Sequence, residues 1–254
     1  MRTDIGRANA ERITLRGRDL VDELVGRVSF TEAALLAITG EAPSPGAVRV
    51  ADAVLVTFID HGLQPSALAA RMTYHVAPEA VQGAVAAGLL GVGSRILGTM
   101  EQTGQLLVRI ADEVAAGAVE SAAVEDVVAA ELAAGRRVPG IGHALHRDGD
   151  PRTRSLLVVA ADEGVATDEI RRLRAVAEVT AERTGRTLPP NAAGVSAALL
   201  LGIGVPWWLH RGISMLSRTA GLVAHIGEEA VRPITPAVRE SLREAGRLEE
   251  GTHG

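Results

Sequence analysis

Two glycines, a proline and a histidine stand together in the segment Pro139-Gly140-Ile141-Gly142-His143. Glycines beside a proline favour a tight turn whose backbone N–H groups can approach a ligand closely. His143 can donate a hydrogen bond to a carbonyl or carboxylate oxygen, and Arg152 carries a guanidinium fork that fits a carboxylate. The segment therefore predicts a site for an anionic, oxygen-rich ligand. Taken alone, it is better explained as a helix end, a loop and a solvated arginine.

His61 and Arg218 are further candidates, each with a structural alternative. His61 precedes Gly62, so it can equally be a helix C-cap that favours the helix dipole. Arg218 can be an arginine on the surface of a helix. Three other histidines, His75, His210 and His225, are interpreted as structural. No grouping of His, Asp and Glu has the spacing of a metal site, so we expect no metal.

Composition excludes several kinds of chemistry. All 26 basic residues are arginine, so no lysine is present to form a Schiff base or complete an ATP-binding Gly-Lys loop. The absence of cysteine removes disulfides, thiolate nucleophiles and cysteine metal ligands. A net charge of -5 with mixed signs argues against nucleic-acid binding, which needs a basic face.

Neither a targeting segment nor a membrane span is apparent. The N-terminal residues are charged and contain no apolar core of a signal peptide. The apolar stretch Val81 to Leu90 is too short to cross a bilayer. We therefore expect a cytoplasmic protein that does not bind membranes.

Helix signals recur along the chain. Ser29 and Glu32 form a capping box that opens a helix ending at Gly40, and a further helix is predicted from Pro78 to Gly91. Arg12 to Leu15 is the one convincing extended segment. Aromatic residues make up only 2% of the chain, so the core must be built from small aliphatic side chains, which suits closely packed helices.

Five sequence segments, in order along the chain, resemble the citrate synthase / citryl-CoA lyase family. The resemblance is closest in type to the citryl-CoA lyase module of ATP-citrate lyase. The matching segments are Ile13 to Leu20 with its continuation to Pro43, Asp60-His61-Gly62, Gly88 to Arg95, Pro139 to Arg152, and Ser217 to Glu228.

The resemblance implies a role for each matching residue. His61 and His143 would be catalytic, hydrogen-bonding the keto acid and stabilising charge on its oxygen. Carboxylates would be bound by Arg152, Arg218 and Arg95. Coenzyme A, as the thioester substrate, would be received by Gly140, Ile141, Gly142 and Ala144, with Arg137 and Arg147 as phosphate partners.

The fold implied by the resemblance is all-α and citrate synthase-like. A large domain would comprise residues 1–96 and 206–254, and a smaller inserted domain residues 97–205. Closure of the smaller domain would exclude water from the thioester. The family resemblance also implies a homodimer, in which the apolar helix from Pro78 to Gly91 would be buried.

The sequence departs from the family pattern at Ala193. The family's Asn-x-Asp segment, whose Asp moves a proton at the acetyl carbon, is matched by Asn191-Ala192-Ala193. Loss of a general acid/base costs roughly 10²–10⁴-fold in rate, so another group has taken over, the reaction differs, or catalysis is lost. The candidate substitutes are His146, Asp148, Ser94 and Ser196.

The function that these observations favour is cleavage of citryl-CoA or a related thioester to acetyl-CoA and oxaloacetate. Two alternatives stay open. The protein can be a condensing or cleaving enzyme for another acyl-CoA and keto acid. It can also be a binding protein for CoA and a dicarboxylate that has lost proton transfer.

Overall fold

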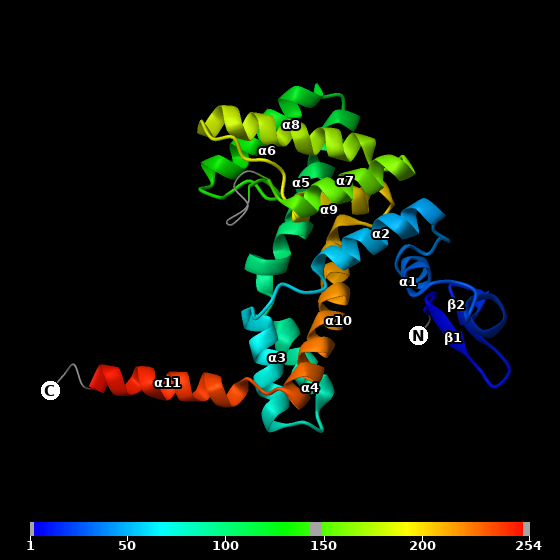
Figure 1. Cartoon of the computed structure of the whole chain (residues 1–254). Coiled ribbons are helices and arrows are strands. Elements are labelled where there is room, and N and C mark those ends of the chain that lie inside the picture. Colours follow the sequence, from blue (N-terminus) through cyan, green and yellow to red (C-terminus); the bar gives the residue numbers. More distant parts are fainter. Residues whose placement is uncertain (1–2, 143–148, 251–254) are drawn as a thin grey trace. The chain divides into compact units, whose positions relative to one another are not determined.

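The computed structural model describes residues 3–142 and 149–250, without the side chains of residues 95, 96 and 247–250. The described chain is mostly helical (Figure 1), which confirms the predicted all-α class. It divides into two compact units. Unit 1 comprises Met1–Thr57 and Thr99–Arg211, and unit 2 comprises Phe58–Gly98 and Gly212–Gly254. The predicted grouping of residues 1–96 with 206–254 into one large domain stays a prediction.

The two units contain different sets of elements. Unit 1 holds strands β1 (Gly6–Ala8), β2 (Ile13–Leu15) and β3 (Arg18–Asp19), with helices α1 (Phe30–Thr39), α2 (Pro45–Phe58), α5 (Gly98–Ala115), α6 (Glu120–Ala133), α7 (Pro151–Glu163), α8 (Thr167–Thr184) and α9 (Ala192–Gly202). Unit 2 holds α3 (Pro65–Val76), α4 (Val81–Leu90), nearly all of α10 (His210–Val231), and α11 (Thr235–Glu250). Short helical turns are Leu20–Leu24, Gly93–Leu97 and Trp207–Leu209.

The extended segment predicted at Arg12 to Leu15 is confirmed as β2, the middle strand of a small antiparallel sheet. Arg16 and Gly17 form the two-residue turn to β3, with φ angles of 51° and 82°. A two-residue hairpin turn of this kind requires positive φ at both positions, which glycine adopts without strain. The Ser29 half of the predicted capping box is also present, because the Ser29 hydroxyl accepts from the Glu32 N–H at 3.1 Å.

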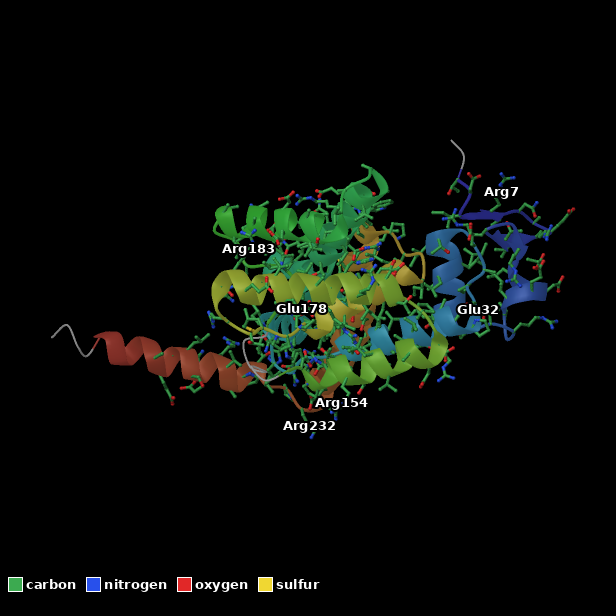
Figure 2. All side chains as sticks on the ribbon, turned by 90° about the horizontal axis from the view of Figure 1, so that it is seen from above. Arg7, Glu32, Arg154, Glu178, Arg183 and Arg232 are labelled. Carbon is green, nitrogen blue, oxygen red and sulfur yellow. The ribbon has the colours of Figure 1, made fainter. Side chains whose placement is uncertain are left out.

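Helix α9 is the buried centre of unit 1. Every residue from Gly194 to Leu200 is buried, as expected for a helix that is apolar on all sides. Helices α7 and α8 pack against α9, and α6 packs against α8 (Figure 1). The inner face of α8 contributes Leu173 and Val176, whereas its charged residues Glu178 and Arg183 lie on the outside (Figure 2).

Small residues allow the helices of unit 2 to pack closely. Ala70 of α3, Ala84 of α4, and Leu222 and Ile226 of α10 form one buried cluster. A Cβ atom on Gly88 would lie 2.7 Å from a methyl carbon of Leu222 and 3.0 Å from the Ser66 carbonyl oxygen, so a larger residue there would force Leu222 to move. No helix among the described residues is both long enough and apolar enough to cross a membrane.

The predicted start of the fourth helix at Pro78 is wrong. Pro78 and Glu79 form a turn, in which the Ala80 N–H donates to the Ala77 carbonyl at 3.0 Å, and α4 begins only at Val81. Proline is favoured at the second position of such a turn because its φ is already fixed there. The same preference makes proline common at helix starts, so the sequence could not separate the two cases.

A buried arginine joins α3 to the end of α10. Arg71 is 1% exposed, and its Nε donates to Glu229 at 2.7 Å. Its other nitrogens donate to the Glu228 carboxylate at 2.8 Å and to the Arg232 carbonyl at 3.0 Å. The guanidinium therefore has partners on all three nitrogens, as a buried charge requires.

Glu229 carries the matching negative charge. Burial alone would raise its pKa, but hydrogen bonds from the Ile234 N–H, from Arg71 and from Thr235 outweigh it and lower the pKa to about 2. The ionised carboxylate also fixes the first turn of α11, because the backbone N–H groups of Ile234 and Thr235 donate to it at 3.0 and 3.1 Å. One carboxylate thus connects α3, α10 and α11.

Replacement of Glu229 by Gln should destabilise the protein in a pH-dependent way. Because the folded pKa is depressed, the carboxylate's stabilisation is fully present above the ordinary glutamate pKa of 4.5 and is lost as pH falls towards about 2. We expect Glu229→Gln to lower the free energy of unfolding by about 3 kcal/mol at pH 7, the scale of breaking a buried pair. Denaturant titrations at pH 7, 4 and 3 measure this. A deficit that does not shrink below pH 4 would contradict the assignment.

Candidate functional site

The predicted glycine turn is present in unit 1 and tightly packed. Gly140 and Gly142 have φ angles of 81° and 75°, in the left-handed region that favours glycine. A Cβ atom on Gly140 would lie 2.6 Å from the Thr103 hydroxyl and 2.9 Å from the Gly194 Cα. The turn therefore lies directly against the first residues of α9, and no other residue type fits at position 140.

Asn191 holds this turn in place and caps α9 at the same time. Its side-chain amide donates to the Gly142 carbonyl at 2.7 Å, and its side-chain oxygen accepts from the Gly194 N–H at 3.0 Å. Backbone bonds reinforce the contact, from Gly142 N–H to Pro189 and from Asn191 N–H to Gly140. The turn predicted to receive CoA is thus fixed to a helix N-terminus, where the helix dipole favours negative charge.

Ala193, which the resemblance matches to the family's Asp, lies in the first turn of α9 and presents only a half-buried methyl group; the match itself stays a prediction. Of the proposed substitutes, Ser196 is fully buried, so its hydroxyl is not accessible to a substrate from solvent. Ser94 is exposed. His146 and Asp148 lie outside the described residues.

Arg152 forms an ion pair with its neighbour Asp150. The Arg152 Nε and Nη2 atoms donate to the two Asp150 oxygens at 3.0 and 2.7 Å. Burial pushes the pKa of Asp150 up, but hydrogen bonds from the Arg152 side chain and backbone, and from Ala192, outweigh it and leave the pKa below its usual value. Two nitrogens of the guanidinium are therefore already engaged, and a substrate carboxylate would have to share or displace Asp150.

In unit 2, a glycine brings the loop carrying His61 against α10. A Cβ atom on Gly221 would collide with the Ile59 carbonyl oxygen, so the loop backbone occupies the space of the missing side chain. The next residue, Asp60, then lies beside His225 on the following turn of α10, with Asp60 Oδ1 2.8 Å from His225 Nε2. Its other oxygen accepts from the Gly62 N–H at 2.8 Å.

His225, which the sequence predicts to be structural, is connected to the candidate site by the Asp60 loop. Its contact with Asp60 and the Gly62 N–H bond to the same carboxylate hold the loop on both sides of His61, whose own side chain is exposed. Burial raises the pKa of Asp60, but hydrogen bonds from Gly62 and His225 outweigh this and lower it. The spacing of Arg218, Gly221 and His225 along one helix face was the available signal.

Arg218 is a buried arginine whose Nε has no hydrogen-bond partner among the described residues. Arg218 is only 4% exposed. Burial lowers the pKa of Arg218, and the nearby negative charge of Asp60 partly opposes this. A cation left incompletely compensated in this way costs stability, so the geometry supports a site that an anionic ligand completes.

Other predicted site residues are only partly described. Arg137 is exposed at the end of the segment that leads to the glycine turn. Ile141 pairs with Pro190 in an isolated β-bridge. His143, Ala144 and Arg147 lie outside the described residues, as does the side chain of Arg95. No group of three or more metal-ligating side chains occurs in the described part of the chain.

Comparison with known proteins identifies the family. The sequence matches the family described as citrate synthase, C-terminal domain, over residues 13–237. The chain belongs to the citrate synthase family. Citrate synthase 2 of Bacillus subtilis is 30% identical over 199 residues, covering 77% of this chain and 50% of that protein. Citrate synthase of Haloferax volcanii is 28% identical over 210 residues, covering 81% and 53%. The chain spans about half the length of the curated relatives it matches.

Solved structures extend the comparison. The citryl-CoA lyase of Hydrogenobacter thermophilus is 34% identical, with a TM-score of 0.80, and the match covers 90% of this chain and 86% of that one. A citrate synthase from Thermoplasma acidophilum, in a ternary complex with carboxymethyl coenzyme A and oxaloacetate, gives a TM-score of 0.65 at 21% identity, covering 80% and 54%. The citrate synthase-like fold predicted from the sequence is confirmed; the roles of individual residues stay predictions.

Arg218→Leu should separate binding from stability in this citrate synthase family member. Loss of a hydrogen bond to a charged group should weaken oxaloacetate binding by about 1.5–3 kcal/mol in calorimetry. The free energy of unfolding should be unchanged or rise by about 1–2 kcal/mol, because a desolvated charge is removed. Unchanged oxaloacetate affinity would remove Arg218 from the site. A large loss of stability would show that Arg218 is structural.

Proposed function

We propose that the protein is a citryl-CoA lyase-like enzyme that cleaves citryl-CoA or a related thioester to acetyl-CoA and oxaloacetate. The observation that carries this proposal is the degree of likeness over the matched residues. The chain is 34% identical to the Hydrogenobacter citryl-CoA lyase with a TM-score of 0.80, and 21% identical to the Thermoplasma citrate synthase with a TM-score of 0.65. The likeness to the lyase is therefore greater in both sequence and structure.

The reaction is a retro-Claisen-type cleavage. The hydroxyl of the citryl group loses its proton, its oxygen becomes the ketone of oxaloacetate, and the adjacent carbon–carbon bond breaks. The electron pair of that bond passes to the thioester as an enolate, which takes up a proton to give acetyl-CoA. In this proposal His61 and His143 hydrogen-bond the reacting oxygen, because charge that develops there needs stabilisation.

The charged parts of the substrate have distinct binding residues in this proposal. Arg218, Arg152 and Arg95 bind carboxylates, and the incompletely compensated charge of Arg218 supports its role. The glycine turn and the exposed Arg137 receive CoA, together with Ala144 and Arg147. The turn lies beside the N-terminus of α9, where the positive end of the helix dipole favours an anionic ligand.

The test is a turnover assay of synthetic citryl-CoA, with oxaloacetate detected through malate dehydrogenase. Release of oxaloacetate supports the lyase. Turnover of another acyl-CoA with a keto acid, but none of citryl-CoA, supports the first alternative. Saturable binding of CoA and oxaloacetate with no product supports the second alternative, a non-catalytic binding protein. This alternative is open because Ala193 cannot transfer a proton.

Ala193→Asp tests how the family Asp has been replaced. We expect the wild type to cleave citryl-CoA slowly and Ala193→Asp to raise the rate at least several-fold, because a carboxylate at this position restores proton transfer. Ala193→Asn is the matched control, since it has the same shape without an ionisable group, and it should not raise the rate. Fast wild-type turnover together with a slower Asp variant would show that a different acid/base is installed.

We also propose that the protein is a homodimer. Two large side chains of α4 are exposed in the single chain, Leu90 at 85% and Val81 at 44%. Burial of such apolar surface by a second copy would stabilise the assembly. Light scattering at micromolar concentration should give the mass of a dimer, and a monomer would contradict this proposal.

A further inference from the structure

A cavity of about 310 Å³ in unit 1 is lined by six polar or charged residues together with Leu106 and Pro139. Gln102, Gln105 and Arg109 come from one face of α5, at the spacing that places side chains together on a helix. Glu131, Arg136 and Arg137 come from the end of α6 and the segment that follows it. Three guanidinium groups therefore face one carboxylate across this hollow.

The single carboxylate is already engaged. Arg136 donates to both Glu131 oxygens, at 2.7 and 3.0 Å. The hydrogen bond from Arg136 and the charges of Arg136 and Arg109 lower the pKa of Glu131, against the opposing effect of burial. Arg109 and Arg137 are exposed and make no ion pair with any described residue. The walls of the cavity thus carry an excess of two positive charges.

We propose that this cluster, Gln102, Gln105, Arg109, Arg136 and Arg137, binds a phosphate group of a phosphorylated ligand. Guanidinium forks match the oxygens of a phosphate, and the glutamine amides can add neutral N–H donors. A polar hollow with an excess of positive charge also concentrates anions from solution. Arg109 and Arg136 are thereby assigned to a ligand site that the sequence did not indicate.

The phosphate can belong to CoA or to another phosphorylated molecule. Arg137 stands three positions before Gly140, so a phosphate held here lies on the chain segment that leads to the glycine turn. The assignment of this phosphate to CoA rests on the proposed function, whereas phosphate binding by the cluster does not.

Calorimetry of the full chain with inorganic pyrophosphate tests the cluster. Arg109→Gln should weaken binding about threefold to tenfold, the scale of a charge-assisted hydrogen bond at an exposed position. Arg27→Gln is the matched control, because Arg27 is an exposed arginine of unit 1 that does not line this cavity. It should bind as the wild type does. Equal affinities for the wild type and Arg109→Gln, or equal losses in Arg109→Gln and Arg27→Gln, would overturn the proposal.

Glu131→Gln should change pyrophosphate affinity in the opposite direction, towards tighter binding. Loss of folded protein would not have this effect. Removal of the carboxylate frees Arg136 and raises the positive charge of the cavity, so pyrophosphate should bind about threefold more tightly or better. Added salt should reduce this gain, since the interaction is exposed. Weaker binding by Glu131→Gln, with an unchanged circular dichroism spectrum, would also overturn the proposal.

CoA and dephospho-CoA, which lacks the ribose 3′-phosphate, distinguish the sources. A loss of CoA affinity in Arg109→Gln, with dephospho-CoA affinity unchanged, identifies the 3′-phosphate as the bound group. Equal losses for both identify the diphosphate. If Arg109→Gln weakens only pyrophosphate binding and leaves both CoA affinities unchanged, the cluster binds a different phosphorylated molecule. Absence of citryl-CoA turnover would contradict the proposed function and leave these binding results intact.

Discussion

Both groups of candidate residues depend on one constraint. A glycine allows the backbone of a loop to lie in close contact with a buried helix. Gly194 of α9 lies against Gly140, and Gly221 of α10 lies against Ile59. Each contact leaves no room for a Cβ atom. Each also fixes a loop: the turn proposed to receive CoA in unit 1, and the His61 loop in unit 2. A core poor in aromatic residues makes such contacts possible, because small side chains let backbones approach.

Buried charges in this protein are of two kinds. Arg71 has acidic or carbonyl partners on all its nitrogens, and Glu229 is held ionised by three neighbouring residues. Arg218 differs, since burial lowers its pKa and its Nε has no hydrogen-bond partner in the described part of the chain. The first kind stabilises the fold. The second opposes folding, and this is the physical reason for connecting Arg218 with an anionic ligand.

Position 193 is where the resemblance predicts a departure from the citrate synthase family. The surrounding framework is intact: Asn191 caps α9 and holds the glycine turn, while Asp150 accepts from both Arg152 and the Ala192 backbone. In the proposed match of Ala193 to the family's Asp, the first turn of α9 carries no ionisable side chain. Binding and catalysis therefore need separate tests.

The sequence alone determined the helical class, the hairpin strand, the Ser29 cap and the glycine turn, because each depends on local backbone preferences. The family could also be predicted from the sequence, because the matching segments keep the order that they have in the family. The start of α4 was missed, as proline favours a turn and a helix start equally. The Asp60–His225 pair, the burial of Arg218 and the arginine cluster around Arg109 were decided only by tertiary structure. Each joins residues distant in sequence, or depends on how much solvent the fold excludes, and no local preference encodes either.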